Sequence, residues 1–192
     1  MVRQESETRR RIVEVAYEQF YSAGFMRAGV DSIAEAAGVT KRTLYYHFES
    51  KDELIAAVLE VQHQLAFERT QRWARKVSGN AGDVVESLFA EFGKWASQPK
   101  WHGSGFTRIA MELADLPGHP ARSIAKRHKA AVEAILAGKL EEAGVAQPQA
   151  TARQVMLLLE GSMALVLIHG DAAYAKEAAA AARRLVEGRT AP

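Results

Sequence analysis

The stretch from Val30 to Phe48, VDSIAEAAGVTKRTLYYHF, constrains the fold more than any other part of the chain. It contains two short helix-forming runs separated by Gly38, Val39 and Thr40. Helices this short are unstable alone, so the two must lock together across the turn at a steep angle. The segment therefore predicts a helix-turn-helix.

Particular residues in this stretch suit that arrangement. Gly38 stands where the first helix ends and the backbone needs a positive φ, which glycine adopts without steric cost. Thr40 precedes the second helix, where a hydroxyl caps backbone N–H groups, and Ala34 is small enough for the second helix to approach closely. The expected apolar contacts beneath the two helices are Ile33, Ala37, Val39, Leu44 and Phe48.

The rest of the chain also favours helix. Ala, Glu, Leu, Lys and Arg recur and strand signals are scarce, which predicts an all-α protein. Gly24 suits a left-handed end to the first helix, and Ser50 with Glu53 forms a capping-box pattern at the start of the fourth. The expected helices cover about 8–23, 31–37, 41–47, 51–76, 83–97, 104–115, 119–143, 149–169 and 172–187, nine in all.

Composition excludes several protein classes. With no cysteine, the chain has no disulfide framework, thiolate metal site or cysteine nucleophile. The net charge of +2 does not by itself indicate a nucleic-acid partner. The opening residues MVRQESETRRR are charged where a signal peptide is apolar, and Glu160 interrupts the longest apolar run, Val155 to Ile168. We expect a cytoplasmic protein without a membrane segment.

The second short helix leaves a polar face exposed. Once Leu44 and Phe48 are assigned to the core, the outer face of its N-terminal half carries charged and aromatic side chains. A recognition helix meets base edges at this point, and Lys or Arg hydrogen-bonds guanine while phenol, imidazole and hydroxyl groups bond phosphate. Lys51 adds a positive charge beside the next helix N-terminus. The exposed set is Lys41, Arg42, Tyr45, Tyr46 and His47.

At these residues the chain resembles the tetracycline-repressor (TetR) family. The segments AYEQFYSAGF and IAEAAGVTKRTLYYHFESKDEL match the DNA-binding domain of that family over residues of about 8–60. The resemblance implies a DNA-binding domain at residues 1–52 and an effector-binding and dimerisation domain at 53–192. It implies base reading by Lys41, Arg42 and Tyr45, and a cap at Thr40. It implies phosphate contacts from Thr43, Tyr46, His47 and Lys51.

The chain departs from the family pattern just before the first short helix. Two hydroxyl residues are usual there, whereas this sequence has Ala28 and Gly29, followed by the acidic Asp31. Backbone N–H groups are therefore expected to hold phosphate at that point.

Structural roles for some of these residues remain open. One of Tyr45 and Tyr46 could be an ordinary partly buried aromatic. The run Arg9 to Arg11 could contact phosphate or form a solvated charged face.

Aromatic residues concentrate between residues 67 and 106. They could line a pocket for a small apolar or aromatic effector, or simply form a packed core. His63, Gln64, His102, Arg108, Glu112 and His128 are further candidates for polar groups in such a pocket. The candidate ligand-binding residues are Phe67, Phe89, Phe92, Trp95, Trp101, Phe106, Met111 and Glu160.

The last two expected helices, about 149–187, suit an interface between two copies of the chain. VMLLLEGSMALVLIHG is apolar nearly all round, more than one face of a small domain needs. The following DAAYAKEAAAAARRL has small residues that permit close packing. Two recognition helices related by a two-fold axis would read a palindrome.

These features predict a ligand-responsive DNA-binding regulator, most simply a dimeric repressor released from its operator by an effector. The alternative is a DNA-binding regulator without a small-molecule ligand, controlled by a protein partner or by abundance. The sequence shows no phosphate loop, catalytic triad motif or metal spacing, so neither an enzyme nor a cofactor is expected.

Overall fold

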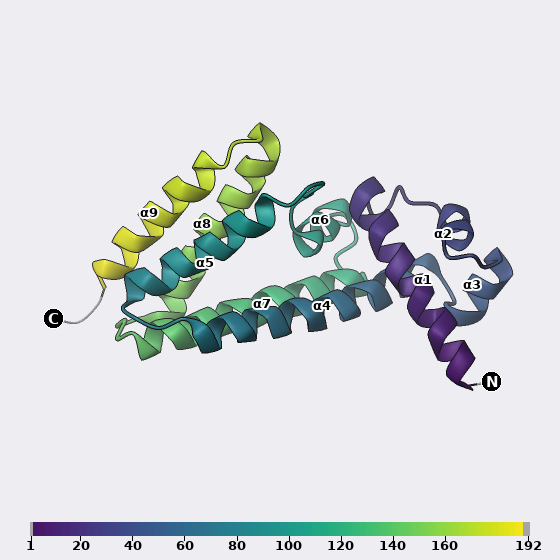
Figure 1. The fold of residues 1–192 in the computed structure, drawn as a ribbon, viewed down its shortest axis with the longest axis horizontal. Helices are drawn as coiled ribbons and strands as arrows, with labels where there is room; N and C mark the ends of the chain where they lie inside the picture. Colours follow the sequence, from purple (N-terminus) through teal and green to yellow (C-terminus); the bar gives the residue numbers. More distant parts are fainter. Residues whose placement is uncertain (1, 190–192) are drawn as a thin grey trace. The chain divides into compact units, whose positions relative to one another are not determined.

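A computed structural model describes residues 2–189, with side chains from residue 7 onward. Nine helices and no strand occur in this part of the chain, which confirms the all-α expectation (Figure 1). They are α1 (Val2–Ala23), α2 (Val30–Ala36), α3 (Lys41–His47), α4 (Lys51–Lys76), α5 (Ala81–Ala96), α6 (Gly105–Glu112), α7 (Pro120–Glu142), α8 (Pro148–His169) and α9 (Ala173–Glu187).

The chain folds into two compact units. The first runs to Leu65 and also takes in Gly105–Arg127, whereas the second comprises Ala66–Ser104 and the chain from His128 onward. Helices α4 and α7 contribute to both units. The first compact unit therefore extends past the expected functional boundary at residues 52 and 53, and it includes α6.

The core of the first unit is built from α1 to α4, α6 and the beginning of α7. Phe20 and Phe25 stack with their ring centroids 5.5 Å apart, and Leu44 is the buried residue of α3. Ile33, Leu54, Ile55 and Ile109 are fully buried in the same cluster. Each short helix thus contributes a few large side chains to one shared core, which supplies the stability that its length does not.

The second unit packs α5, α8 and α9 side by side (Figure 1). Its core is formed by Val84, Val85, Leu136, Leu140, Val155, Met163 and Val186 with the alanines of α9. Ala182 is fully buried, and a side chain at Gly82 of α5 would meet Arg183 within 3.1 Å. Small residues therefore bring α5 and α9 close together at this end.

The observed start of α5 lies two residues before the expected one. Asn80 accepts a hydrogen bond from the Asp83 amide, and the Asp83 carboxylate accepts one from the Asn80 amide, each at 3.0 Å. This reciprocal capping box holds Ala81 and Gly82 inside the helix. At α4, the Ser50 hydroxyl accepts a hydrogen bond from the Glu53 amide at 3.1 Å, as expected. The Glu53 carboxylate accepts a hydrogen bond from the Glu49 amide instead of the Ser50 amide.

Among the described residues, α8 is the one helix with the length and hydropathy of a membrane span. Of its most apolar window, 44% is buried within the protein. One side of α8 packs in the core of the second unit. On its other side Leu157 and Ile168 are exposed.

Candidate nucleic-acid interface

The turn between α2 and α3 is closed by backbone hydrogen bonds. Gly38 has φ +64°, its amide donates to the Glu35 carbonyl, and the Val39 amide donates to the Ala34 carbonyl, each at 3.0 Å. This pair of bonds around a left-handed residue is a Schellman motif. It ends α2 and turns the chain toward α3, as the glycine predicted.

Thr40 begins α3. Its hydroxyl accepts a hydrogen bond from the Thr43 amide at 3.0 Å and lies 2.8 Å from the Thr43 hydroxyl. Leu44 and Phe48 are buried below. Thr40 therefore orients α3, and the Thr43 side chain is already engaged with this cap.

The exposed face of α3 carries the residues expected to meet DNA. Lys41 and Arg42 are exposed, and the side chains of Tyr45 and Tyr46 are 42% and 73% exposed. His47 is half-buried, with its ring edge-on to Tyr46 at 5.2 Å. Large aromatic side chains at this level of exposure do little for the core, which favours a binding role for them.

Lys41 is paired with an acidic group of α2. Its ammonium lies 2.9 Å and 3.1 Å from the two carboxylate oxygens of Asp31. The hydrogen bond and the charge of Asp31 raise the pKa of Lys41 above its ordinary value. Because both side chains are more than half exposed, solvent screens the pair. Asp31 therefore orients Lys41 without burying its charge.

Lys51 is held inside the first unit. Its ammonium donates to the Met26 carbonyl at 2.7 Å and lies 5.9 Å from the centre of the Phe20 ring. Burial lowers the pKa of Lys51 below its ordinary value, against the nearby charges of Asp52 and Glu112. The hydrogen bond to Met26 fixes Lys51 to the turn before α2. A phosphate bound by Lys51 would therefore share the ammonium group with the Met26 carbonyl.

All three consecutive arginines of α1 make contacts within the unit. Arg11 donates to the Ala37 carbonyl at 3.0 Å, at the C-terminal end of α2. The Arg9 guanidinium lies over the Phe48 ring at 4.8 Å. Arg10 is exposed and lies 3.7 Å from Glu14. Thus this run does more than form a solvated charged face.

The sequence did not predict that α6 hydrogen-bonds to the end of α1 and to the turn that follows it. Arg108 donates to the Tyr21 carbonyl at 2.7 Å, near the end of α1. Glu112 accepts from the Met26 amide at 2.9 Å. The sequence suggests both residues as polar groups of an effector pocket, whereas the structure shows them hydrogen-bonded to α1 and to the turn after it. No local pattern marks them, because their partners lie more than eighty residues away.

At the start of α2, Gly29 has an extended conformation and no side chain caps the helix. The Ser32 hydroxyl donates to the Gly29 carbonyl at 2.9 Å. The backbone amides of this first turn therefore have no side-chain acceptor at the cap position. A backbone contact to phosphate at this point stays a prediction.

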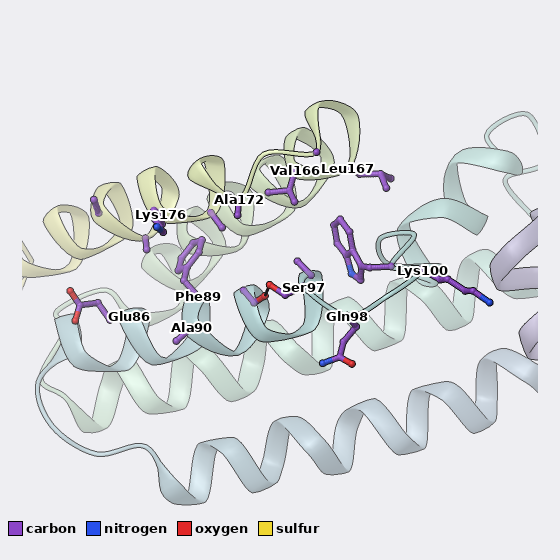
Figure 2. A pocket seen from close by; sticks show the side chains of 17 residues that line it. Glu86, Phe89, Ala90, Ser97, Gln98, Lys100, Val166, Leu167, Ala172 and Lys176 are labelled. Atoms are coloured by element: carbon purple, nitrogen blue, oxygen red, sulfur yellow. Dashed lines mark hydrogen bonds between the residues drawn. The ribbon is translucent and has the colours of Figure 1, made fainter.

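The candidate ligand-binding residues fall into both units. Trp101 lies 5.7 Å edge-on from Trp95 and 6.1 Å from Phe92. Trp101 and Phe89 also line a groove formed by α5, α8 and α9 (Figure 2). The four residues that come together in this way are Phe89, Phe92, Trp95 and Trp101.

The other four candidates lie elsewhere. Phe67 is half-buried in the second unit, and Glu160 pairs with Lys129, which also donates to the Ser104 hydroxyl at 3.3 Å. Phe106 belongs to the core of the first unit, and Met111 of the same unit is 68% exposed. The structure does not gather all eight residues into one pocket. No group of three metal-ligating side chains occurs among the described residues.

Comparison with known proteins finds a family that matches the helix-turn-helix region. Residues 12–58 match the family described as "Bacterial regulatory proteins, tetR family". Over this segment the chain is similar to the tetR family. The matched segment covers the last part of α1, α2, α3 and the beginning of α4, which are the elements whose caps and contacts are described above.

Curated relatives match the chain through the same region. The HTH-type transcriptional regulator TtgR of Pseudomonas putida is 45% identical over 58 residues, 30% of this chain and 28% of that protein. A probable acrEF/envCD operon repressor of Escherichia coli is 40% identical over 47 residues, 24% of this chain and 21% of that protein. The matches thus span under a third of these relatives' length. Their names are those of regulators, in agreement with the expectation that the chain is not an enzyme.

Solved structures extend the likeness to the whole fold. A TetR-family transcriptional regulator from Streptomyces coelicolor has a TM-score of 0.85 and 25% identity, with 97% of each chain covered. A putative regulator of the same kind from Streptomyces avermitilis has a TM-score of 0.77 and 29% identity, covering 91% of this chain and 97% of that one. The helical arrangement beyond residue 58 is therefore also that of tetR-family structures.

Proposed function

We propose that this protein is a ligand-responsive transcriptional repressor that binds a palindromic DNA operator as a dimer and is released by a small effector. The observation that carries the proposal is the face of α3. Lys41, Arg42, Tyr45 and Tyr46 are exposed on a helix whose start and buried side are set by Thr40 and Leu44. A rigid short helix with an exposed basic and aromatic face suits the major groove.

Each side chain on this face has a specific task. Arg42 and Lys41 would donate to guanine O6 and N7, and Tyr45 would contact a thymine methyl group or a base edge. Thr43, Tyr46 and His47 would contact phosphate and set the register of α3 on the duplex. Asp31 would hold Lys41 in position until a base or phosphate oxygen replaces it.

The exposed side of α8 supports dimerisation through α8 and α9. Leu157, Leu165 and Ile168 are exposed, with Leu157 at 69% and Ile168 at 71%. Leu157, Gly161, Leu165 and Ile168 recur at three- to four-residue spacing, so they form one apolar stripe. Burying this stripe against a second copy would remove it from water. Two copies would place two α3 helices on a palindrome.

Repression and release follow from the dimer. The operator-bound dimer would block transcription, and an effector in the second unit would favour a conformation whose α3 helices no longer match successive grooves. Effector and operator would then weaken each other's binding by about 1–3 kcal/mol. A protein that works in this way would act in the cytoplasm, where it meets DNA.

Selection of bound fragments from random DNA tests the proposal. Wild type should enrich a palindrome, and the variant carrying Lys41→Ala, Arg42→Ala and Tyr45→Ala should not. Arg75→Ala, which removes an exposed arginine at the end of α4, is the control and should enrich the same palindrome. Equal enrichment by wild type and the triple variant would overturn the role of α3.

Single variants then separate base reading from general attraction. Arg42→Ala should cost about 1–3 kcal/mol on the selected operator and relax the preference at one position. Lys51→Ala should weaken all sequences alike and lower the salt dependence by about one phosphate contact. Since Lys51 also holds the Met26 carbonyl, thermal unfolding of this variant must be measured beside its DNA binding. If no small molecule changes operator affinity, the effector hypothesis is wrong. Control by a protein partner or by abundance is then the remaining hypothesis.

A further inference from the structure

A groove runs along the second unit between α5 and α9. Its volume is about 950 Å³, and it is partly open. Close packing at Gly82 and Ala182 joins α5 and α9 at one end. The groove has Phe89 and Trp101 in its lining, with Val166 and Leu167 contributed by α8 (Figure 2). We call this the α5–α9 groove.

The charges around the groove are unequal. Glu86 lies at one end, but its carboxylate is 2.7 Å from Arg183, which also bonds Glu187 at 2.7 Å. Lys176 on α9 is exposed, and no ion pair of the described residues includes it. The acidic end of the groove is thus neutralised, while its lysine is not.

Trp101 is held in the groove without a hydrogen bond. Its indole N–H is buried and has no partner among the described residues, and its ring packs edge-on against Trp95. Lys100, just before it, has φ +59°, a strained conformation for a residue with a side chain. In Figure 2 the Lys100 side chain extends away from the groove. An unpaired buried donor and a strained neighbour are features that gather at ligand sites.

We propose that the α5–α9 groove binds a small aromatic carboxylate, with its ring between Phe89 and Trp101 and its carboxylate near the Lys176 ammonium. The apolar lining suits the ring, and the uncompensated lysine selects an anion. The inference rests on the proposed function, since it assigns the effector a place and a charge.

The lining favours a compact molecule over a second copy of the chain. The groove is a concave site bounded by three helices, whereas the exposed apolar stripe of α8 is the surface suited to a second copy. A continuous apolar partner would also leave the Lys176 ammonium without a compensating charge.

The ligand test uses 1-naphthoate and its neutral counterpart 1-naphthamide, titrated into the full chain by calorimetry. Wild type should bind naphthoate more tightly than naphthamide. Lys176→Gln should weaken naphthoate about threefold, the size expected of an exposed ion pair, and leave naphthamide unchanged. Lys76→Gln, which removes an exposed lysine at the end of α4 outside the groove, is the matched control and should change neither.

A second variant blocks the groove itself. A Cβ at Gly93 of α5 would meet no atom within 4 Å, so Gly93→Leu adds a side chain to the groove without a backbone clash. It should weaken both probes more than about tenfold, since it occupies the site of the ring. Gly138→Leu is the control, because Gly138 is also helical, also has no atom within 4 Å of its Cβ position, and lies outside the lining.

Three outcomes would overturn the inference. The first is no binding of either probe at millimolar concentration, and the second is naphthoate binding that Gly93→Leu and Lys176→Gln leave unchanged. The third is a change in oligomeric state caused by Gly93→Leu in light scattering, which would make the groove an interface between copies. Operator binding by the same proteins is measured separately. Naphthoate that binds in the groove without releasing operator would contradict the proposed coupling and leave the site intact.

Discussion

The helix-turn-helix and the α5–α9 groove are built from contacts of very different range. In the helix-turn-helix, the Gly38 turn and the Thr40 cap act between residues within five positions of each other. In the groove, Phe89 and Trp101 meet residues of α8 and α9 that lie more than sixty positions further along the chain. A local device can be recognised from a short stretch of sequence, whereas a groove exists only after distant helices pack.

The two regions also differ in what their exposed residues do. On α3, Tyr45 and Tyr46 are exposed while the helix below them is fixed by Leu44. In the second unit, Trp101 is partly buried but has an unpaired N–H. Exposure marks the proposed DNA surface, and an unsatisfied buried donor marks the proposed ligand surface.

The largest expected effect comes from the core of the helix-turn-helix. Leu44→Ala removes the buried side chain of α3 and should lower the free energy of unfolding by about 2–5 kcal/mol. Hydrogen exchange should show the loss in the amides of α2 and α3, with those of α8 less affected. Tyr46→Ala, at an exposed position of the same helix, should change stability by less than about 0.5 kcal/mol. Equal losses in both variants would contradict the division of α3 into a buried and an exposed face.

Substitution by alanine at two glycines should change the free energy of unfolding in opposite directions. Gly38→Ala should destabilise by about 1–2 kcal/mol, because φ +64° is unfavourable for a residue with a Cβ. Gly93→Ala should stabilise by about 0.5–1 kcal/mol, because Gly93 is inside α5 and its Cβ position is unobstructed. Urea unfolding of the two variants checks both signs. A loss at Gly93 would show that the groove wall is closer than described.

The cap of α3 should have an intermediate effect. Thr40→Ala removes the acceptor of the Thr43 amide and should destabilise by about 1 kcal/mol. Thr40→Ser keeps a hydroxyl and should retain most of the stability. Chemical denaturation with both variants separates the cap from the methyl group of threonine, and an equal loss in both would remove the cap from the explanation.

The smallest expected effect on stability comes from the Lys41–Asp31 ion pair. Because the folded-state pKa of Lys41 is raised, its contribution to stability is present below the unfolded-state pKa and is lost as pH rises through the folded-state value. Asp31→Asn should lower the pKa of Lys41 toward its ordinary value and remove that pH dependence. NMR titration of the Lys41 side chain measures the shift.

Much of the fold followed from the sequence because helix formation and capping are local. The helix-turn-helix, its glycine and its threonine cap were predicted, as were the helices that follow. The start of α5 was placed two residues late, since the Asn80–Asp83 box was not recognised. Arg108 and Glu112 could not be assigned, because nothing near them in sequence indicates Tyr21 and Met26 as partners.

The sequence by itself determined an all-helical chain with a tetR-like helix-turn-helix and a basic and aromatic face on α3, since periodicity, caps and the motif between residues 30 and 48 are short-range properties. Tertiary structure alone decided that Lys51 holds the Met26 carbonyl and that Glu160 pairs with Lys129. It also decided that Phe89 and Trp101 line one groove while Phe106 and Met111 belong to the other unit. The physical reason is that a side chain's partner across a core depends on how whole helices pack, which spacing along one helix does not specify.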